Sequence, residues 1–252
     1  MDQCRIRIAA AGDIHFGERP NDRERAAEAF GGLAGRADVV LLAGDLTTHG
    51  EPEQGAIVAG AVRDLDIPVV TVLGNHDWHS NQAGELTAVL QEAGITVLDR
   101  SHTILDVCDV EVGIAGAKGF VGGFAGSHLP DFGEPSLRAV YAEGMDEVRG
   151  LDESLRAIAL CPFRIALLHY APTSDTLVGE RRDIWTFLGT DRLAPPILEH
   201  APNLVLHGHA HAGTFEGRVG EVPVYNVSVP VLGEDWWVFE LAGEARAPSE
   251  VR

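Results

Sequence analysis

Short apolar segments, each ending in a polar turn that often contains glycine, recur along the chain and limit its fold more than any other feature. Three of them in the first half are typical of strands and cover residues 5–11, 38–43 and 68–73. The stretches between and after them have the apolar spacing of helices and cover residues 23–36, 51–65 and 85–93. Strands that alternate with helices predict a parallel α/β arrangement for this half.

The second half of the chain predicts more antiparallel pairing. Short apolar segments follow one another closely at 96–98, 103–107 and 111–115. Further strands are expected at 164–168, 203–206, 222–227 and 236–241, and a helix at 135–160. A glycine-rich loop is expected over 116–133, and loops of this length often serve as lids or binding loops. Nothing forces a split, so we expect one domain over 1–245 and a short tail over 246–252.

Composition restricts the class of protein and of partner. The 252 residues carry 19 basic and 38 acidic side chains, and the formal net charge of −19 argues against binding a nucleic-acid backbone. The three cysteines lie far apart, which predicts no disulfide framework or thiolate zinc site and favours a cytoplasmic protein. No signal-peptide pattern is present, and no apolar run approaches the roughly 20 residues of a membrane-spanning helix.

Side chains of the kinds that bind metal ions directly follow several of the expected strands. They are Asp13, His15, Asp45, Asn75, His76, His169, His209 and His211. The carboxyl ends of strands in α/β sheets meet at one rim, where ligands commonly bind. A single turn of this kind would mean little, but such side chains follow five separate strands. We therefore expect them to share one site.

The ligand types in this set indicate divalent metals rather than a structural zinc. Imidazole, carboxylate and amide oxygen together suit Mn, Fe, Co, Ni and Zn, and no thiolate belongs to the set. A carboxylate has two oxygens and can bridge two metals about 3.5–4 Å apart. Glycine precedes Asp45, Asn75 and His209, which allows sharp turns and a close approach of the backbone.

The same segments, in this order, resemble the five sequence blocks of the calcineurin-like metallophosphoesterase family. Those blocks stand here as Gly12-Asp13-Ile14-His15, Gly44-Asp45, Gly74-Asn75-His76-Asp77, His169 and Gly208-His209-Ala210-His211. The resemblance runs from residue 12 to residue 211, and no block is missing. It implies an α/β (α+β) fold, a four-layer αββα sandwich in which two mixed β-sheets pack face to face with helices outside.

The resemblance also implies a dinuclear metal site at the carboxyl ends of the strands. Its ligands would be Asp13, His15 and His211 for one ion, Asn75, His169 and His209 for the other, and Asp45 as the bridge between them. His76 is not a metal ligand in this family and would donate a proton or stabilise transition-state charge. Asp77 would orient His76 or brace its loop.

The expected activity is hydrolysis of a phosphate ester, by in-line attack on phosphorus of a hydroxide shared by two divalent metal ions. Manganese is the expected metal, with iron, nickel, cobalt and zinc as alternatives. The expected substrate is a small phosphodiester such as a cyclic nucleotide. Candidate substrate contacts are His49, Lys118, Arg181 and Arg182.

Other activities stay open at this level. Phosphomonoesterase and nuclease are alternatives within the family, although the acidic charge weighs against a nuclease. A protein phosphatase is disfavoured, because the segment after Asp45 lacks Asp-Arg-Gly and the third block ends in Asp77 instead of Glu. A non-catalytic scaffold for partner proteins is the alternative from another class. It is disfavoured because every ligand position is filled and His76 is present.

Overall fold

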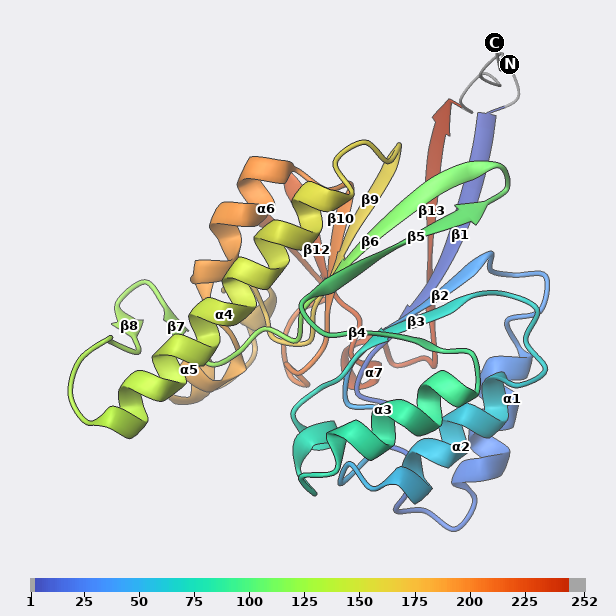
Figure 1. Ribbon diagram of the computed structural model, residues 1–252, viewed down its shortest axis with the longest axis horizontal. Helices are drawn as coiled ribbons and strands as arrows, with labels where there is room; N and C mark the ends of the chain where they lie inside the picture. Colours follow the sequence, from blue (N-terminus) through green and yellow to red (C-terminus); the bar gives the residue numbers. More distant parts are fainter. Residues whose placement is uncertain (1–2, 245–252) are drawn as a thin grey trace.

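Two large mixed β-sheets form the centre of the protein, of which the computed structural model describes residues 3–244 (Figure 1). The first sheet has five strands in the order β13-β1-β2-β3-β4. Their bounds are β1 Gln3–Ala11, β2 Val39–Ala43, β3 Val69–Val72, β4 Thr96–Leu98 and β13 Trp237–Glu244. Strands β1 to β4 are parallel, and β13 pairs antiparallel with β1 at the edge. The expected tail, 246–252, lies outside the described residues.

The second sheet has six strands in the order β11-β12-β10-β9-β6-β5. Their bounds are β5 Ser101–Val107, β6 Val110–Gly116, β9 Phe163–Leu167, β10 Leu204–His207, β11 Glu216–Val219 and β12 Val222–Asn226. The four central strands are parallel, and β5 and β11 flank them antiparallel. Because β9 and β10 pair in parallel, their carboxyl ends lie side by side.

Helices cover the outer face of each sheet, which gives four layers (Figure 1). The first sheet is covered by α1 Asp22–Gly31, α2 Pro52–Val62 and α3 Ala83–Glu92, and the second by α4 Pro135–Ala157 and α6 Ala194–His200. Between the sheets, Ile8 and Leu41 of the first share a core with Ile114 and Ile165 of the second. The α/β class and the four-layer arrangement expected from the sequence are confirmed.

The continuous apolar run of β2 follows from its position between two cores. All five of its residues are buried. Leu41 packs into the core between the sheets, whereas Leu42 packs into the core under the helices of the first sheet. Successive side chains of a strand point to opposite faces, so a strand covered on both sides needs an apolar residue at every position.

Several short elements are not predicted by the sequence. They are β11, a hairpin of β7 Gly123–Phe124 and β8 Ser127–His128 within the glycine-rich loop, α5 Trp185–Leu188, α6, α7 Val229–Leu232, and four single-turn 3-10 helices, η1 His76–Trp78, η2 Asp175–Leu177, η3 Arg182–Ile184 and η4 Asp191–Leu193. Helix α1 ends at Gly31, before the predicted end at residue 36, because consecutive glycines weaken a helix. None of the described helices is both long and apolar enough to span a membrane.

Candidate metal centre

The predicted ligands lie beyond the carboxyl ends of strands from both sheets. Strand β1 leads to Asp13 and His15, β2 to Asp45, β3 to Asn75 and His76, β9 to His169, and β10 to His209 and His211. Hydrogen bonds near the strand ends join the two sheets at this rim. The Gly12 N–H donates to the Val227 carbonyl at 2.8 Å, and His169 Nδ1–H donates to the Ala43 carbonyl at 2.8 Å. The ligand segments of the two sheets are thereby held together.

Donor atoms of the predicted ligands and of His76 come close enough to hold cations. In each of three groups, one atom per residue lies within 4.8 Å of the others: Asp13, His15 and His211; His15, Asp45 and His76; Asp45, His169 and His209. The Asp45 carboxylate lies between two of these sets. Its Oδ2 is 3.8 Å from His15 Nε2, and its Oδ1 is 3.4 Å from His169 Nε2. This is the arrangement of a carboxylate that can bridge two ions.

One close approach and two hydrogen bonds position the remaining donors of the cluster. Asn75 Oδ1 lies 2.9 Å from His169 Nε2, so the amide oxygen and the imidazole point to the same place. The backbone N–H of His76 donates to Asp45 Oδ1 at 2.8 Å, and that of His209 donates to Asp13 Oδ2 at 2.8 Å. Each carboxylate is therefore oriented by the backbone of a neighbouring ligand segment.

Four of these residues have left-handed backbone conformations that residues other than glycine rarely adopt. The φ angle is 58° at Asp13, 45° at His15, 51° at Asp45 and 69° at His209. Such conformations cost of order 1–3 kcal/mol each and persist only where the surrounding structure enforces them. Their concentration at one rim indicates that local stability is given up to direct these side chains toward a common point.

Glycines of the sequence blocks leave the space that the carboxylates occupy. A Cβ at Gly74 would lie 2.0 Å from Asp45 Oδ1, and one at Gly208 would lie 2.3 Å from Asp13 Oδ2. Both distances are far below van der Waals contact. Any larger residue would displace a carboxylate, so the close approach requires glycine at both positions.

Backbone carbonyls determine which ring nitrogen of two histidines is available. A carbonyl only accepts hydrogen bonds, so the nitrogen beside it carries the proton. His169 uses Nδ1 for the Ala43 carbonyl and leaves Nε2, whereas His209 uses Nε2 for the Phe187 carbonyl at 3.0 Å and leaves Nδ1. Burial lowers the pKa of both rings, that of His209 to about 3, so both are neutral at pH 7. Neutral imidazoles oriented in this way are the form that binds metals.

The negative charge at the rim also fits cations. The Asp45 side chain is almost fully buried, and burial together with the charges of Asp13 and Asp77 raises its pKa. Ionising all three carboxylates is costly unless positive charge is bound between them. With imidazoles and the Asn75 amide oxygen beside them, the Asp13 and Asp45 carboxylates form a donor set suited to Mn, Fe, Co, Ni or Zn.

His76 lies at the same rim with one ring nitrogen uncommitted. Its Nδ1–H donates to the Thr48 carbonyl at 2.8 Å, which leaves Nε2. The ring lies edge-on to His15, with 4.6 Å between the centroids. Thr48, rather than Asp77, therefore orients the imidazole.

Asp77 braces the segments that carry Asp45 and His76. It is fully buried and accepts hydrogen bonds from the N–H of Gly74 at 2.9 Å, from the N–H of Thr47 at 2.9 Å and from the Thr47 hydroxyl at 2.7 Å. These bonds tie the segment after β2 to the segment after β3. Of the two roles expected from the resemblance, the contacts favour bracing.

The sequence blocks and the geometry of the rim agree with one family of known proteins. Residues 6–213 match the model of the calcineurin-like phosphoesterases, which is most of the chain. The chain belongs to this family. Membership supports metal-dependent hydrolysis of phosphate esters as its chemistry.

Similar proteins include both sequence relatives and solved structures. A probable cyclic nucleotide phosphodiesterase of Synechococcus sp. is 25% identical to this phosphoesterase over 236 residues, which cover 86% of this chain and 78% of the relative. Phosphopantetheinyl hydrolase from Mycobacterium tuberculosis has a TM-score of 0.63 at 15% identity and matches over 88% of each chain. Purple acid phosphatase from yellow lupin seeds has a TM-score of 0.53 at 13% identity and covers 90% of this chain and 44% of its own. The two solved structures show the shared fold.

Lys118 is the predicted substrate contact that shares a cavity with a predicted metal ligand. It lines a cavity of about 370 Å³ together with Asn75 and Tyr170. Burial lowers the pKa of Lys118, whose ammonium lies 4.3 Å from the centre of the Phe120 ring. A cation in this cavity is in a position to contact a bound ester.

The other predicted substrate contacts have partners of their own. His49 is exposed, and its backbone N–H donates to Gln54 at 2.8 Å. Arg181 pairs with Asp183, and the Arg182 guanidinium lies 4.9 Å from the centre of the Trp185 ring. The contacts of both arginines are with neighbouring side chains of one surface segment.

Two aromatic residues beside the ligands were not predicted from the sequence. The Tyr170 ring lies 4.4 Å from that of His209, and Trp78, at the end of η1, lines the same cavity as Asn75. Each follows a sequence block directly, His169 in one case and Asp77 in the other. That adjacency is the only sequence signal that points to them.

Proposed function

We propose that this phosphoesterase is a phosphodiesterase that hydrolyses a small phosphate ester at a dinuclear metal centre. The observation that carries the proposal is the position of Asp45. Its two carboxylate oxygens face different histidines, His15 at 3.8 Å and His169 at 3.4 Å. A carboxylate placed in this way can serve two ions at once.

The close groups of donor atoms support one set of ligands for each ion. We assign Asp13, His15 and His211 to one ion, Asn75, His169 and His209 to the other, and Asp45 to both. Manganese is the metal we propose. Bound there, two divalent ions supply Lewis acidity and a hydroxide nucleophile at neutral pH.

His76 is the residue we assign to the leaving group. The Thr48 carbonyl holds its Nδ1 proton, and Nε2 is free. In the protonated imidazolium this nitrogen donates a proton to the departing oxygen or a hydrogen bond to a phosphoryl oxygen. Groups in such positions contribute about 10²–10⁴-fold to rate. Asp77 contributes by holding the segments that carry His76 and Asp45.

Two observations favour a small diester. The Synechococcus relative is a probable cyclic nucleotide phosphodiesterase by name. The net charge of −19 opposes long nucleic acids, whose phosphates would be repelled. A phosphomonoesterase differs in substrate and not in the metal centre, so the assay must include both kinds of ester.

Hydrolysis of bis(p-nitrophenyl) phosphate beside p-nitrophenyl phosphate tests the proposal. Metal-stripped protein is assayed after addition of Mn, Ni, Zn or Mg, with the variants His76→Ala and His102→Ala in parallel. His102 is an exposed histidine on β5 and serves as the matched control. We expect metal-dependent turnover that favours the diester and falls about 100-fold or more in His76→Ala alone. Faster monoester turnover would indicate a phosphatase, and bound metal without any turnover would indicate a scaffold.

A further inference from the structure

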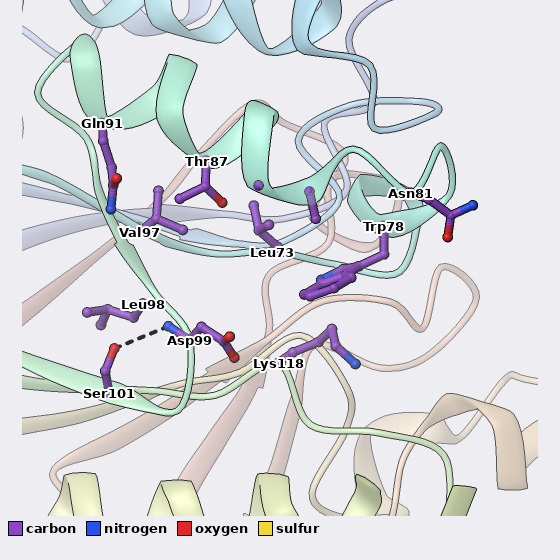
Figure 2. Close-up of a pocket in the computed structure, with 12 residues that line it drawn as sticks. Leu73, Trp78, Asn81, Thr87, Gln91, Val97, Leu98, Asp99, Ser101 and Lys118 are labelled. Carbon is purple, nitrogen blue, oxygen red and sulfur yellow. Dashed lines mark hydrogen bonds between the residues drawn. The ribbon is translucent and has the colours of Figure 1, made fainter. Parts of the chain in front are cut away.

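A second cavity extends away from the metal centre, between helix α3 and the segment that joins β4 to β5 (Figure 2). Its volume is about 520 Å³, which falls within the range of small-molecule sites. Figure 2 shows Trp78 and Lys118 at one end of it and Gln91 at the other. No role in the hydrolytic reaction accounts for a cavity at this place.

This cavity adjoins the one beside the proposed ligands. Trp78, Asp99 and Lys118 line both cavities, and Asn75 lines the one nearer the metals. Trp78 and Asn75 belong to the same turn, in which the Trp78 N–H donates to the Asn75 carbonyl at 3.3 Å. A substrate whose phosphorus lies at the metals can therefore extend past Trp78 toward α3.

The lining of the outer cavity combines apolar side chains with uncharged polar ones. The apolar side chains are Leu73, Val97 and Leu98, and the uncharged polar ones are Asn81, Thr87, Gln91 and Ser101. The indole of Trp78 is 45% exposed, which is unusual for so large an apolar side chain. An exposed aromatic face beside amide and hydroxyl groups suits a planar ring that both stacks and forms hydrogen bonds.

The charges around the two cavities exclude some ligands. Lys118 and Arg100 are the cations, and Asp99, Glu143 and Glu147 are the anions. Lys118 and Arg100 both lie near Glu147, a buried carboxylate that also accepts the Gly119 N–H at 2.9 Å. The lining has no surplus of positive charge, so a second phosphate or carboxylate on the substrate would be repelled. A neutral group fits better.

We infer that this cavity binds the base of a nucleoside phosphodiester, stacked on Trp78 and contacted by polar side chains of α3. The inference rests on the proposed function, because it places the ester phosphorus at the metal centre. It specifies the substrate class as a nucleotide diester. A sugar without a base fits less well, because it has no planar ring to stack on the exposed Trp78 indole.

Two esters with the same leaving group separate recognition of the base from the chemistry. The p-nitrophenyl ester of thymidine 5′-phosphate carries a nucleoside, whereas methyl p-nitrophenyl phosphate carries a methyl group in its place. We expect kcat/KM to be at least about tenfold higher for the nucleoside ester, since stacking of a base on an aromatic side chain has an effect of this size. Cyclic AMP and the dinucleotide ApA, assayed in parallel, distinguish a mononucleotide from the end of a nucleic acid. We expect turnover of cyclic AMP.

Glycine positions in two helices allow a matched pair of variants. A Cβ at Gly84, in α3, meets no atom within 4 Å, and Gly84 lines the cavity, so Gly84→Leu adds an apolar side chain to its wall. Gly60, in α2, has the same open surroundings outside both cavities, and Gly60→Leu is the control. Trp78→Ala removes the stacking face, and Trp78→Phe keeps an aromatic ring. We expect Gly84→Leu and Trp78→Ala to abolish the preference for the nucleoside ester over the methyl ester, and we expect Trp78→Phe and Gly60→Leu to keep it.

Calorimetric binding of AMP and ribose 5-phosphate to metal-loaded protein supplies a measurement that needs no turnover. We expect AMP to bind at least about tenfold more tightly, and we expect Gly84→Leu to remove the difference. Equal binding, together with equal turnover of the two p-nitrophenyl esters, would overturn the inference and leave the proposed phosphodiesterase intact. Preferential AMP binding without hydrolysis of either ester would overturn the proposed function and leave the base site.

Discussion

Backbone conformation at single residues determines where the proposed ligands lie. Asp13, Asp45 and His209 all have positive φ angles, and the glycines beside Asp45 and His209 make room for the turns. The tautomers of the site histidines depend on carbonyl groups, as at Ala43 and Thr48. A carbonyl position carries no side-chain signal, so these orientations cannot be predicted from the residue types alone.

Gly74→Ala tests how closely the backbone must approach Asp45. The added Cβ would lie 2.0 Å from Asp45 Oδ1 and must displace it. We expect metal affinity to fall about 10–100-fold, because the carboxylate loses its orientation. Isothermal titration of metal-stripped protein with Mn measures this affinity.

Gly60→Ala is the control for that variant, because its Cβ enters open space on α2. It should keep the metal affinity and raise the stability of the helix by up to about 1 kcal/mol. Equal metal affinity in Gly74→Ala and Gly60→Ala would mean that Asp45 does not bind metal in its present position.

At the scale of elements, Asp77 links the segment after β2 to the segment after β3. Its carboxylate accepts hydrogen bonds from the backbone of Thr47 and Gly74, and Asp77→Ala would leave these buried N–H groups without a partner. We expect a loss of about 2–6 kcal/mol in the free energy of unfolding, at about 1–3 kcal/mol for each of the two unsatisfied groups. Urea denaturation measures it.

The kinetics of Asp77→Ala distinguish bracing from direct catalysis. A bracing residue acts through Asp45 and His76, so turnover should fall while the pH profile of kcat keeps its shape. If kcat of Asp77→Ala no longer fell at low or at high pH as it does in the wild type, with unchanged stability, Asp77 would instead be a proton-transfer group.

An ion pair between Arg7 on β1 and Asp38, directly before β2, makes part of the stability dependent on pH. The hydrogen bond from Arg7, at 2.7 Å, lowers the pKa of Asp38. A lowered pKa gives stability that is present above the unfolded value of about 3.9 and is lost as the pH falls through the folded value. We expect Asp38→Asn to lower the melting temperature by about 2–4 °C at pH 7 and by less below pH 4.

Thermal unfolding of the wild type and of Asp38→Asn at pH 3 and at pH 7 measures this difference. Asp183→Asn is the control, because the Arg181–Asp183 pair is highly exposed and exposed pairs contribute little. A deficit in Asp38→Asn that is the same at pH 3 and pH 7 would show that the ion pair contributes nothing to acid sensitivity.

Long elements with clear periodicity could be predicted from the sequence, whereas short ones could not. The helix predicted over 135–160 is α4, Pro135–Ala157, and the buried run at 38–43 is β2, Val39–Ala43. The hairpin of β7 and β8 has only two residues in each strand, too few for a period to be visible. Helix α6 contains two consecutive prolines near its start, which hide a helical pattern.

For the molecule as a whole, the sequence predicts the candidate site at the rim better than it predicts the order of strands in the two sheets. The polar residues that follow each strand are enough to predict a shared site, and the structure brings their side chains within reach of one another. The order of strands does not follow from the pattern. The chain leaves the first sheet after β4, builds the second from β5 to β12 and returns as β13 beside β1. The division into two sheets was implied by the family resemblance and not by hydrophobic periodicity.

Metal content and diester turnover of Asp45→Asn, measured beside wild type, test the central claim most directly. The proposed centre predicts two divalent ions per chain in the wild type, since Asp45 lies between both sets of donors. The amide that replaces the carboxylate in this variant carries no charge and offers one oxygen instead of two. We predict fewer than two ions per chain and turnover lower by about 100-fold or more. An Asp45→Asn protein that keeps two ions and full turnover would contradict a centre built on this carboxylate.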